Sequence, residues 1–174
     1  MAGEDREEVT GMDEAMREAL RGVRAVLWHW GRADRRIAEL QDEQRLAGAR
    51  MEDLYSVGGV RNADGGPRST VPGDPVFRAY ESIERQRALF GDEVEACEAA
   101  IKREMDFKAA VAALLKALPH AQREVVRMRY GAGGHTWPYV AIMLGMSESG
   151  AKDLDAKACA ALIGRIEVTR GMAD

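Results

Sequence analysis

The stretch that decides the fold runs from Leu118 to Ile166 and reads LPHAQREVVRMRYGAGGHTWPYVAIMLGMSESGAKDLDAKACAALIGRI. Its apolar spacing and its helix-start and helix-stop residues predict three helices separated by two breaks. The first helix, about 121–130, follows Pro119. The run Gly131–Gly134 ends it, because glycine loses the most backbone entropy on ordering.

Two capping signals bracket the second break. Thr136, followed by Trp137 and Pro138, predicts the start of the second helix, since proline is tolerated where the amide has no partner. Gly145 ends that helix at a position that often needs a left-handed residue, and Ser147 caps a third helix. Two helices joined by so tight a turn are the helix-turn-helix signature, in which the second helix lies in the DNA major groove.

The same stretch resembles region 4 of the sigma-70-type factors. With its long helical N-terminal part, the chain is similar in layout to the phage and prophage sigma-like regulators of the ArpU and RinA type. The resemblance implies a DNA-binding transcriptional regulator of late or packaging genes, and leaves contact with RNA polymerase open. The matching residues are Leu118, Pro119, Arg129, Tyr130, Gly131, Thr136, Val140, Ala141, Leu144, Gly145, Ser147, Leu154, Ala158 and Leu162.

Any contact with the DNA bases must come from residues at the start of the third helix. Carboxylates there can accept from cytosine and serine can reach several bases, while basic residues would anchor the phosphates. Where region 4 usually carries arginines or a glutamine, this chain has Glu148, Gly150 and Asp153, and Asp155 adds a charge that phosphate would repel. Isolated DNA binding should therefore be weak. The predicted DNA-binding residues are Arg127, Arg129, Thr136, Ser147, Glu148, Ser149, Lys152, Asp153 and Lys157, with Arg123 as a further backbone anchor.

Two long helices are predicted before this module. Residues 16–54 show apolar side chains at alternating spacings of three and four, with Gln44 as the polar member, which is the pattern of a helix packed on another helix. Gly31 is the expected position of a kink or break in this helix. A second such stripe follows Asp74-Pro75 and includes Ile83, Phe90, Val94 and Cys97.

The predicted fold is all-α, with a long antiparallel helical hairpin followed by a C-terminal three-helix module. The hairpin covers 12–117, with helices over most of 14–57 and 75–117 and a glycine- and proline-rich linker at 58–74. The module covers 118–168. Trp30 and Ile37 are expected to face the stripe from Ile83 to Cys97, either within one chain or across a homodimer. The predicted core of the module is Val125, Met128, Val140, Met143, Leu144, Leu154, Ala158 and Leu162.

Composition and charge narrow the function. Residues 118–174 hold seven Lys/Arg and six Asp/Glu, a net charge of +1, whereas the first 117 hold 18 basic and 23 acidic residues, a net charge of −5. The acidic part suits a protein partner better than phosphate. No apolar run is long enough for a membrane span and no secretory signal is present, so we expect a cytoplasmic protein.

No catalytic set, metal-ligand spacing or phosphate-binding loop is recognisable. Cys97 and Cys159 stand alone, which favours packing over a disulfide, and His29 has no partner of metal-ligand type. We therefore expect no enzymatic activity, cofactor or metal. Besides the regulator, two hypotheses stay open: a small terminase-like DNA-recognition subunit, and an adaptor that binds proteins through its acidic coiled coil.

Overall fold

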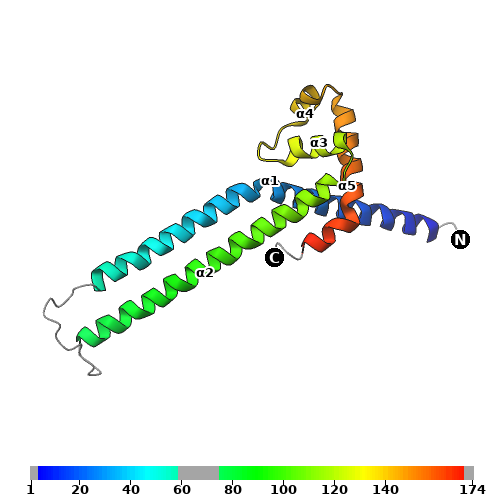
Figure 1. Ribbon diagram of the computed structural model, residues 1–174. Coiled ribbons are helices and arrows are strands. Elements are labelled where there is room, and N and C mark those ends of the chain that lie inside the picture. Colours follow the sequence, from blue (N-terminus) through cyan, green and yellow to red (C-terminus); the bar gives the residue numbers. More distant parts are fainter. Residues whose placement is uncertain (1–3, 59–74, 171–174) are drawn as a thin grey trace. The chain divides into compact units, whose positions relative to one another are not determined.

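The computed structural model describes residues 4–58 and 75–170 (Figure 1). Five helices, with no strand in these ranges, confirm the all-α class. The predicted linker 58–74 lies outside the described residues apart from Gly58. The helices are α1 (Glu4–Gly58), α2 (Pro75–Lys116), α3 (His120–Tyr130), α4 (Trp137–Leu144) and α5 (Glu148–Arg170).

The chain forms two compact units whose limits cut across α1 and α2. The first unit is residues 1–36 with 103–174, and the second is residues 37–102. The N-terminal half of α1 and the end of α2 therefore belong with α3, α4 and α5, although the sequence predicted a boundary at residue 118. In α1 the heptad pattern runs unbroken across residue 36, so the sequence of that helix gives no sign of this division.

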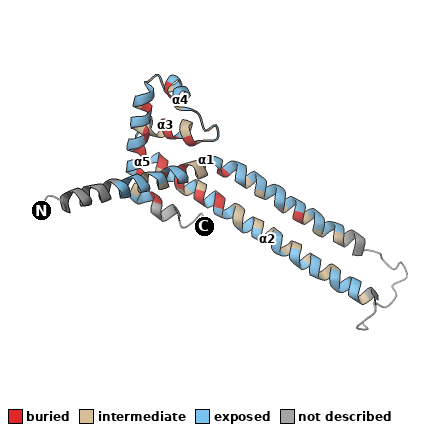
Figure 2. Ribbon diagram, turned by 180° about the vertical axis from the view of Figure 1, so that it is seen from behind, coloured by how far each residue is buried: buried red, intermediate tan, exposed pale blue. Residues whose placement is uncertain are grey.

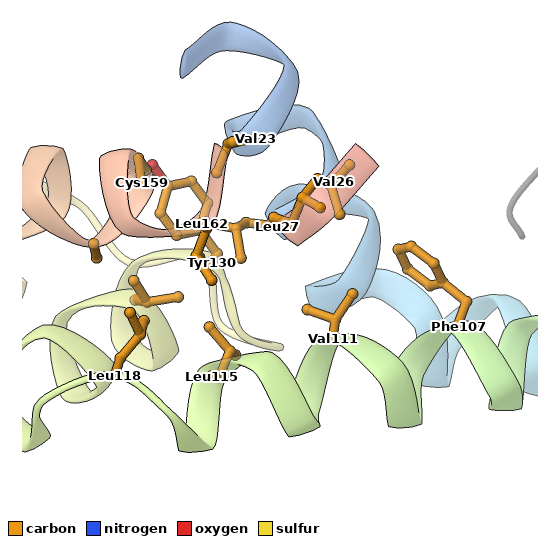
Figure 3. Packing of buried hydrophobic residues seen from close by; sticks show 13 residues of the cluster. Val23, Val26, Leu27, Phe107, Val111, Leu115, Leu118, Tyr130, Cys159 and Leu162 are labelled. Atoms are coloured by element: carbon orange, nitrogen blue, oxygen red, sulfur yellow. The ribbon is translucent and has the colours of Figure 1, made fainter. Parts of the chain in front are cut away.

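The core of the first unit joins four helices. Figure 2 shows its buried residues gathered where α1 and α2 meet α3 and α5, and Figure 3 shows Leu27, Tyr130 and Leu162 pointing toward one another. Each Å² of apolar surface removed from water stabilises the fold by about 25 cal/mol, so we expect this cluster to contribute most to the stability of the unit. Its buried members are Val23, Val26, Leu27, Phe107, Val111, Leu115, Leu118, Val126, Tyr130, Ala158, Cys159, Leu162 and Ile166.

Trp30 packs on this cluster as a partly buried side chain. The cluster contains none of Ile83, Phe90, Val94 or Cys97, so the predicted pairing of Trp30 with that stripe within one chain is wrong, while the alternative across a homodimer stays a prediction. Polar contacts in the same region also join α1 to α2. The nearly buried carboxylate of Glu104 lies 3.1 Å from His29 Nε2 and 2.9 Å from Arg36 Nε.

Gly31 does not break α1, because the helix continues through it to Gly58. Glycine is required at position 31 because the backbones of α1 and α3 approach each other closely there. A Cβ at position 31 would lie 1.6 Å from the backbone oxygen of Tyr130, so only glycine lets α1 pack directly on the end of α3. This contact ties α1 to the C-terminal helices.

In the second unit the helices meet with little burial. Among its described side chains only Ala47 is buried, and the stripe residues Ile37, Phe90 and Val94 are half-buried. Gln44, the polar member of the stripe in α1, donates a 2.9 Å hydrogen bond to Glu98 of α2. The two segments therefore contact each other within one chain. In the described part of the chain, no helix combines the length and apolar character needed to cross a membrane.

Candidate nucleic-acid interface

The turn between α4 and α5 is built by Gly145. Its φ of 63° and ψ of 35° are left-handed, a conformation that glycine adopts without the Cβ penalty. The amide of Met146 then donates to the carbonyl of Ala141 at 3.0 Å, a bond that satisfies a free carbonyl at the helix end. Met146 and Leu144 pack beside the turn. These features confirm the predicted stop at Gly145.

Ser147 caps α5 as predicted. Its Oγ accepts a hydrogen bond from the amide of Gly150 at 3.1 Å, which satisfies one of the free amides of the first turn. A Cβ at position 150 would lie 3.2 Å from that oxygen, so glycine leaves room for the cap. Thr136 precedes α4 in extended conformation without a side-chain capping bond, so its exposed hydroxyl is not used by the helix start.

A small second core holds α3, α4 and α5 together. Val125, Val140 and Ala151 are fully buried, and Trp137 and Leu154 pack around them. Further predicted core residues take their expected places, since Ala158 and Leu162 are buried and Met128 and Leu144 are partly buried.

Met143 is the exception, with 56% of its surface exposed. Helix α4 has no charged side chain, so its sequence distinguishes the inner face from the outer one only weakly. The inner face is formed by Val140 and Ala141, while Ile142 (78%) and Tyr139 (42%) are exposed with Met143. Tyr139 stacks on His135 with 4.2 Å between ring centroids.

The outward face of α5 carries most of the predicted DNA-binding residues. Lys152 and Lys157 are exposed, whereas Ala158 and Leu162 are buried, as the spacing predicted. Lys152 Nζ lies 2.6 Å from Glu148 Oε1, an exposed ion pair one turn apart. The exposed residues of the predicted set on and beside α5 are Ser147, Glu148, Ser149, Lys152, Asp153 and Lys157.

The arginines of α3 divide into two kinds. Arg127 is exposed and pairs with Glu124 at 3.3 Å, so its side chain lies at the surface as a phosphate contact requires. Arg129 instead donates to the backbone oxygen of His135 at 2.8 Å. Its guanidinium also lies 4.9 Å from the Trp28 ring and 5.0 Å from the Trp137 ring. These cation–π contacts give Arg129 a structural role, and its predicted phosphate contact stays a prediction.

Comparison with protein-family models, characterised proteins and solved structures finds no match to this chain.

Asp155 does not face outward, so the expectation that it repels phosphate is wrong. It is 1% exposed, and its carboxylate lies 3.3 Å from Arg24 of α1 and 3.7 Å from the thiol of Cys159. A surface role was inferred from its charge alone. Its spacing indicated the opposite, because Asp155 stands three residues before Ala158 and four before Cys159 on the buried stripe.

This buried network changes the acidity of its members. Burial and the charge of Asp155 raise the pKa of Cys159 to about 12 and also raise the pKa of Tyr130. Burial acts to lower the pKa of Arg24, but Asp155, Tyr130 and Cys159 together outweigh burial and the net pKa is raised. The Cys159 thiol is therefore protonated near neutral pH, a poor nucleophile or metal ligand. Among the described residues, no three His, Cys, Asp or Glu side chains could hold a metal ion, and neither cysteine forms a disulfide.

Proposed function

We propose that this protein is a phage- or prophage-type transcriptional regulator that binds double-stranded DNA through α4 and α5. In this proposal α4 and α5 act as a sigma region 4-like helix-turn-helix, and the long helices form an antiparallel hairpin. The observation that carries the proposal is the left-handed Gly145 turn followed directly by the Ser147 cap. It leaves the start of α5 uncovered, which a helix entering the major groove requires.

The chemistry of the outward face of α5 is compatible with base contacts. Glu148 and Asp153 can each accept a hydrogen bond from the cytosine amine, and Ser149 can donate or accept. The pair between Glu148 and Lys152 is solvent-exposed, so it contributes little to folding and can be exchanged for DNA contacts. Lys157, further along the helix, is placed for a phosphate contact.

Charge makes the non-specific part of binding small. Residues 118–174 carry a net charge of +1 and the preceding chain is acidic, so few phosphates are neutralised. Each phosphate contact contributes about 0.9 to the slope of log affinity against log salt. We therefore expect a shallow salt dependence and greater reliance on base contacts or on a second protein such as RNA polymerase.

Fluorescence anisotropy on a site selected from random DNA, and on scrambled DNA, tests this function across a salt series. Lys157→Ala should weaken binding to both DNAs alike and reduce the salt slope by about 0.9. Ser149→Ala should instead lower the preference for the selected site, by roughly 1–3 kcal/mol if a readable contact is lost. Arg45→Ala, an exposed substitution in the second unit, is the matched control and should change neither. The proposal fails if the wild type binds no DNA at low salt, with or without RNA polymerase.

A protein-binding adaptor is the second candidate, favoured by the exposed face of α4. Tyr139, Ile142 and Met143 form an apolar surface on a helix without a charged residue, and uncovered apolar surfaces commonly mark interaction sites. Ile142→Ser should abolish binding of a protein partner while leaving DNA affinity unchanged. Loss of DNA affinity alone in this variant would argue against the adaptor.

A further inference from the structure

The buried carboxylate of Asp155 lies where α1 and α5 meet in the first unit. Its partner Arg24 is on α1, with 44% of its side chain exposed, against 1% for Asp155. Tyr130 of α3 also approaches the carboxylate, which is one cause of the raised pKa of that tyrosine. An acidic side chain on α5 is therefore surrounded by groups from three helices.

The large buried side chains of α5, Leu162 and Ile166, lie in its second half. Among residues 148–157, Ala151 is the only buried apolar residue, and Leu154 is partly buried. Side chains this small bury little apolar surface, so the apolar pattern fixes the rotation of the first half of α5 only weakly. Asp155 differs, because a buried charge without its partner is strongly unfavourable.

The orientation of Asp155 determines what the opposite face presents. Successive residues of an α-helix are about 100° apart, so Asp153, two residues earlier, points roughly away from Asp155. Both residues follow this geometry, with Asp155 buried and Asp153 exposed. Ser149 lies on the exposed side as well. A rotation of α5 that separated Asp155 from Arg24 would also turn Asp153 and Ser149 away from their outward positions.

We infer that Arg24, acting through Asp155, is a positioning residue that fixes the rotation of α5 and so keeps Ser149 and Asp153 directed outward for DNA. The inference rests on the proposed function for its consequence, but the rotation itself is a property of the fold. Buried ion pairs are often no more stabilising than apolar replacements and can instead specify one arrangement. Stability and positioning are therefore separable by mutation.

The decisive variant replaces the pair by apolar residues, Arg24→Met with Asp155→Leu. We expect it to melt at or above the wild-type temperature, yet to lose about tenfold or more in the ratio of affinities for selected and scrambled DNA. Arg24→Lys, which keeps the charge, should retain most of that ratio. Arg21→Ala, exposed one turn earlier on α1, is the control and should leave the ratio unchanged. A double variant that folds and keeps the wild-type ratio would overturn the inference.

A measurement without DNA separates this inference from the proposed function. Amide hydrogen exchange in the first half of α5 should be faster in the double variant than in the wild type at matched melting temperature, because this half, no longer held by Arg24, opens locally more often. If the wild type binds no DNA, the proposed function fails. The comparison of hydrogen exchange between the double variant and the wild type then tests by itself whether Arg24 fixes the rotation of α5. Unchanged exchange along α5 would refute the role of Arg24 even where DNA binding is established.

Discussion

Substitution of Gly31 by alanine tests the contact that joins α1 to α3. The new Cβ would lie 1.6 Å from the backbone oxygen of Tyr130, whereas ordinary contact begins at about 3.4 Å. Helix α1 would have to retreat by about 1.8 Å, the difference between these two distances. The obstacle is backbone, so no side-chain rotation can relieve it. The retreat would also loosen the packing of Leu27 and Trp28 on the C-terminal helices.

The expected size follows from two opposed effects. Overpacking costs typically ~1–3 kcal/mol, and an immovable backbone atom places Gly31→Ala at the upper end. Alanine gains roughly 1 kcal/mol over glycine in a helix interior. We expect a net loss of about 2 kcal/mol, which lowers the Tm of a chain of this size by about 4–8 °C.

The control is Gly48→Ala in the same helix. No atom lies within 4 Å of the Cβ that this substitution would add, so only the gain in helix propensity applies. Its Tm should rise by about 1–4 °C. Thermal melting followed by circular dichroism measures both variants. A rise in Tm for Gly31→Ala matching that of Gly48→Ala would refute the close packing of α1 on α3.

Further predictions concern burial and acidity. Leu162→Ala should lower the free energy of unfolding by about 2–5 kcal/mol, whereas the exposed Met143→Ala should change it by less than about 0.5 kcal/mol; equal losses in urea denaturation would contradict the assigned inner face. The folded-state pKa of Cys159 is raised from 9.0 to about 12. The protonated thiol therefore contributes its full share to the free energy of unfolding below pH 9. This share is lost as pH rises toward 12, at up to ~1.4 kcal/mol per pH unit. Cys159→Ala should therefore lose less stability than the wild type between pH 8 and 10.5, and parallel losses would exclude this linkage. Arg129→Lys should lower Tm through its lost cation–π contacts, and an unchanged Tm would assign Arg129 no structural role.

The local chemistry of the C-terminal helices was predictable because its determinants are close in sequence. A serine three residues before Gly150 forms its cap with no help from distant residues, and Gly145 adopts the left-handed conformation of its own turn. The outward position of Lys152 and Lys157 follows from helical spacing. The predicted base-reading surface depends on such local rules, although its function stays a proposal.

The same rules failed where a face had to be chosen between similar residues. In α4 no side chain is charged, so nothing in its sequence marks Met143 as exposed. For Asp155 the charge suggested solvent, but Arg24, far away in the chain, supplies the compensation that permits burial. A pairing partner at such sequence distance leaves no periodic signal.

The sequence by itself determined the helices, the tight turn between α4 and α5 and the caps beside it, because backbone entropy and local hydrogen bonds act over a few residues. The tertiary structure alone decided that α1 belongs to the core of the C-terminal helices. That outcome depends on the apolar cluster that the four helices share and on the space at Gly31. Both are relations between atoms that the chain brings together only after the helices have packed.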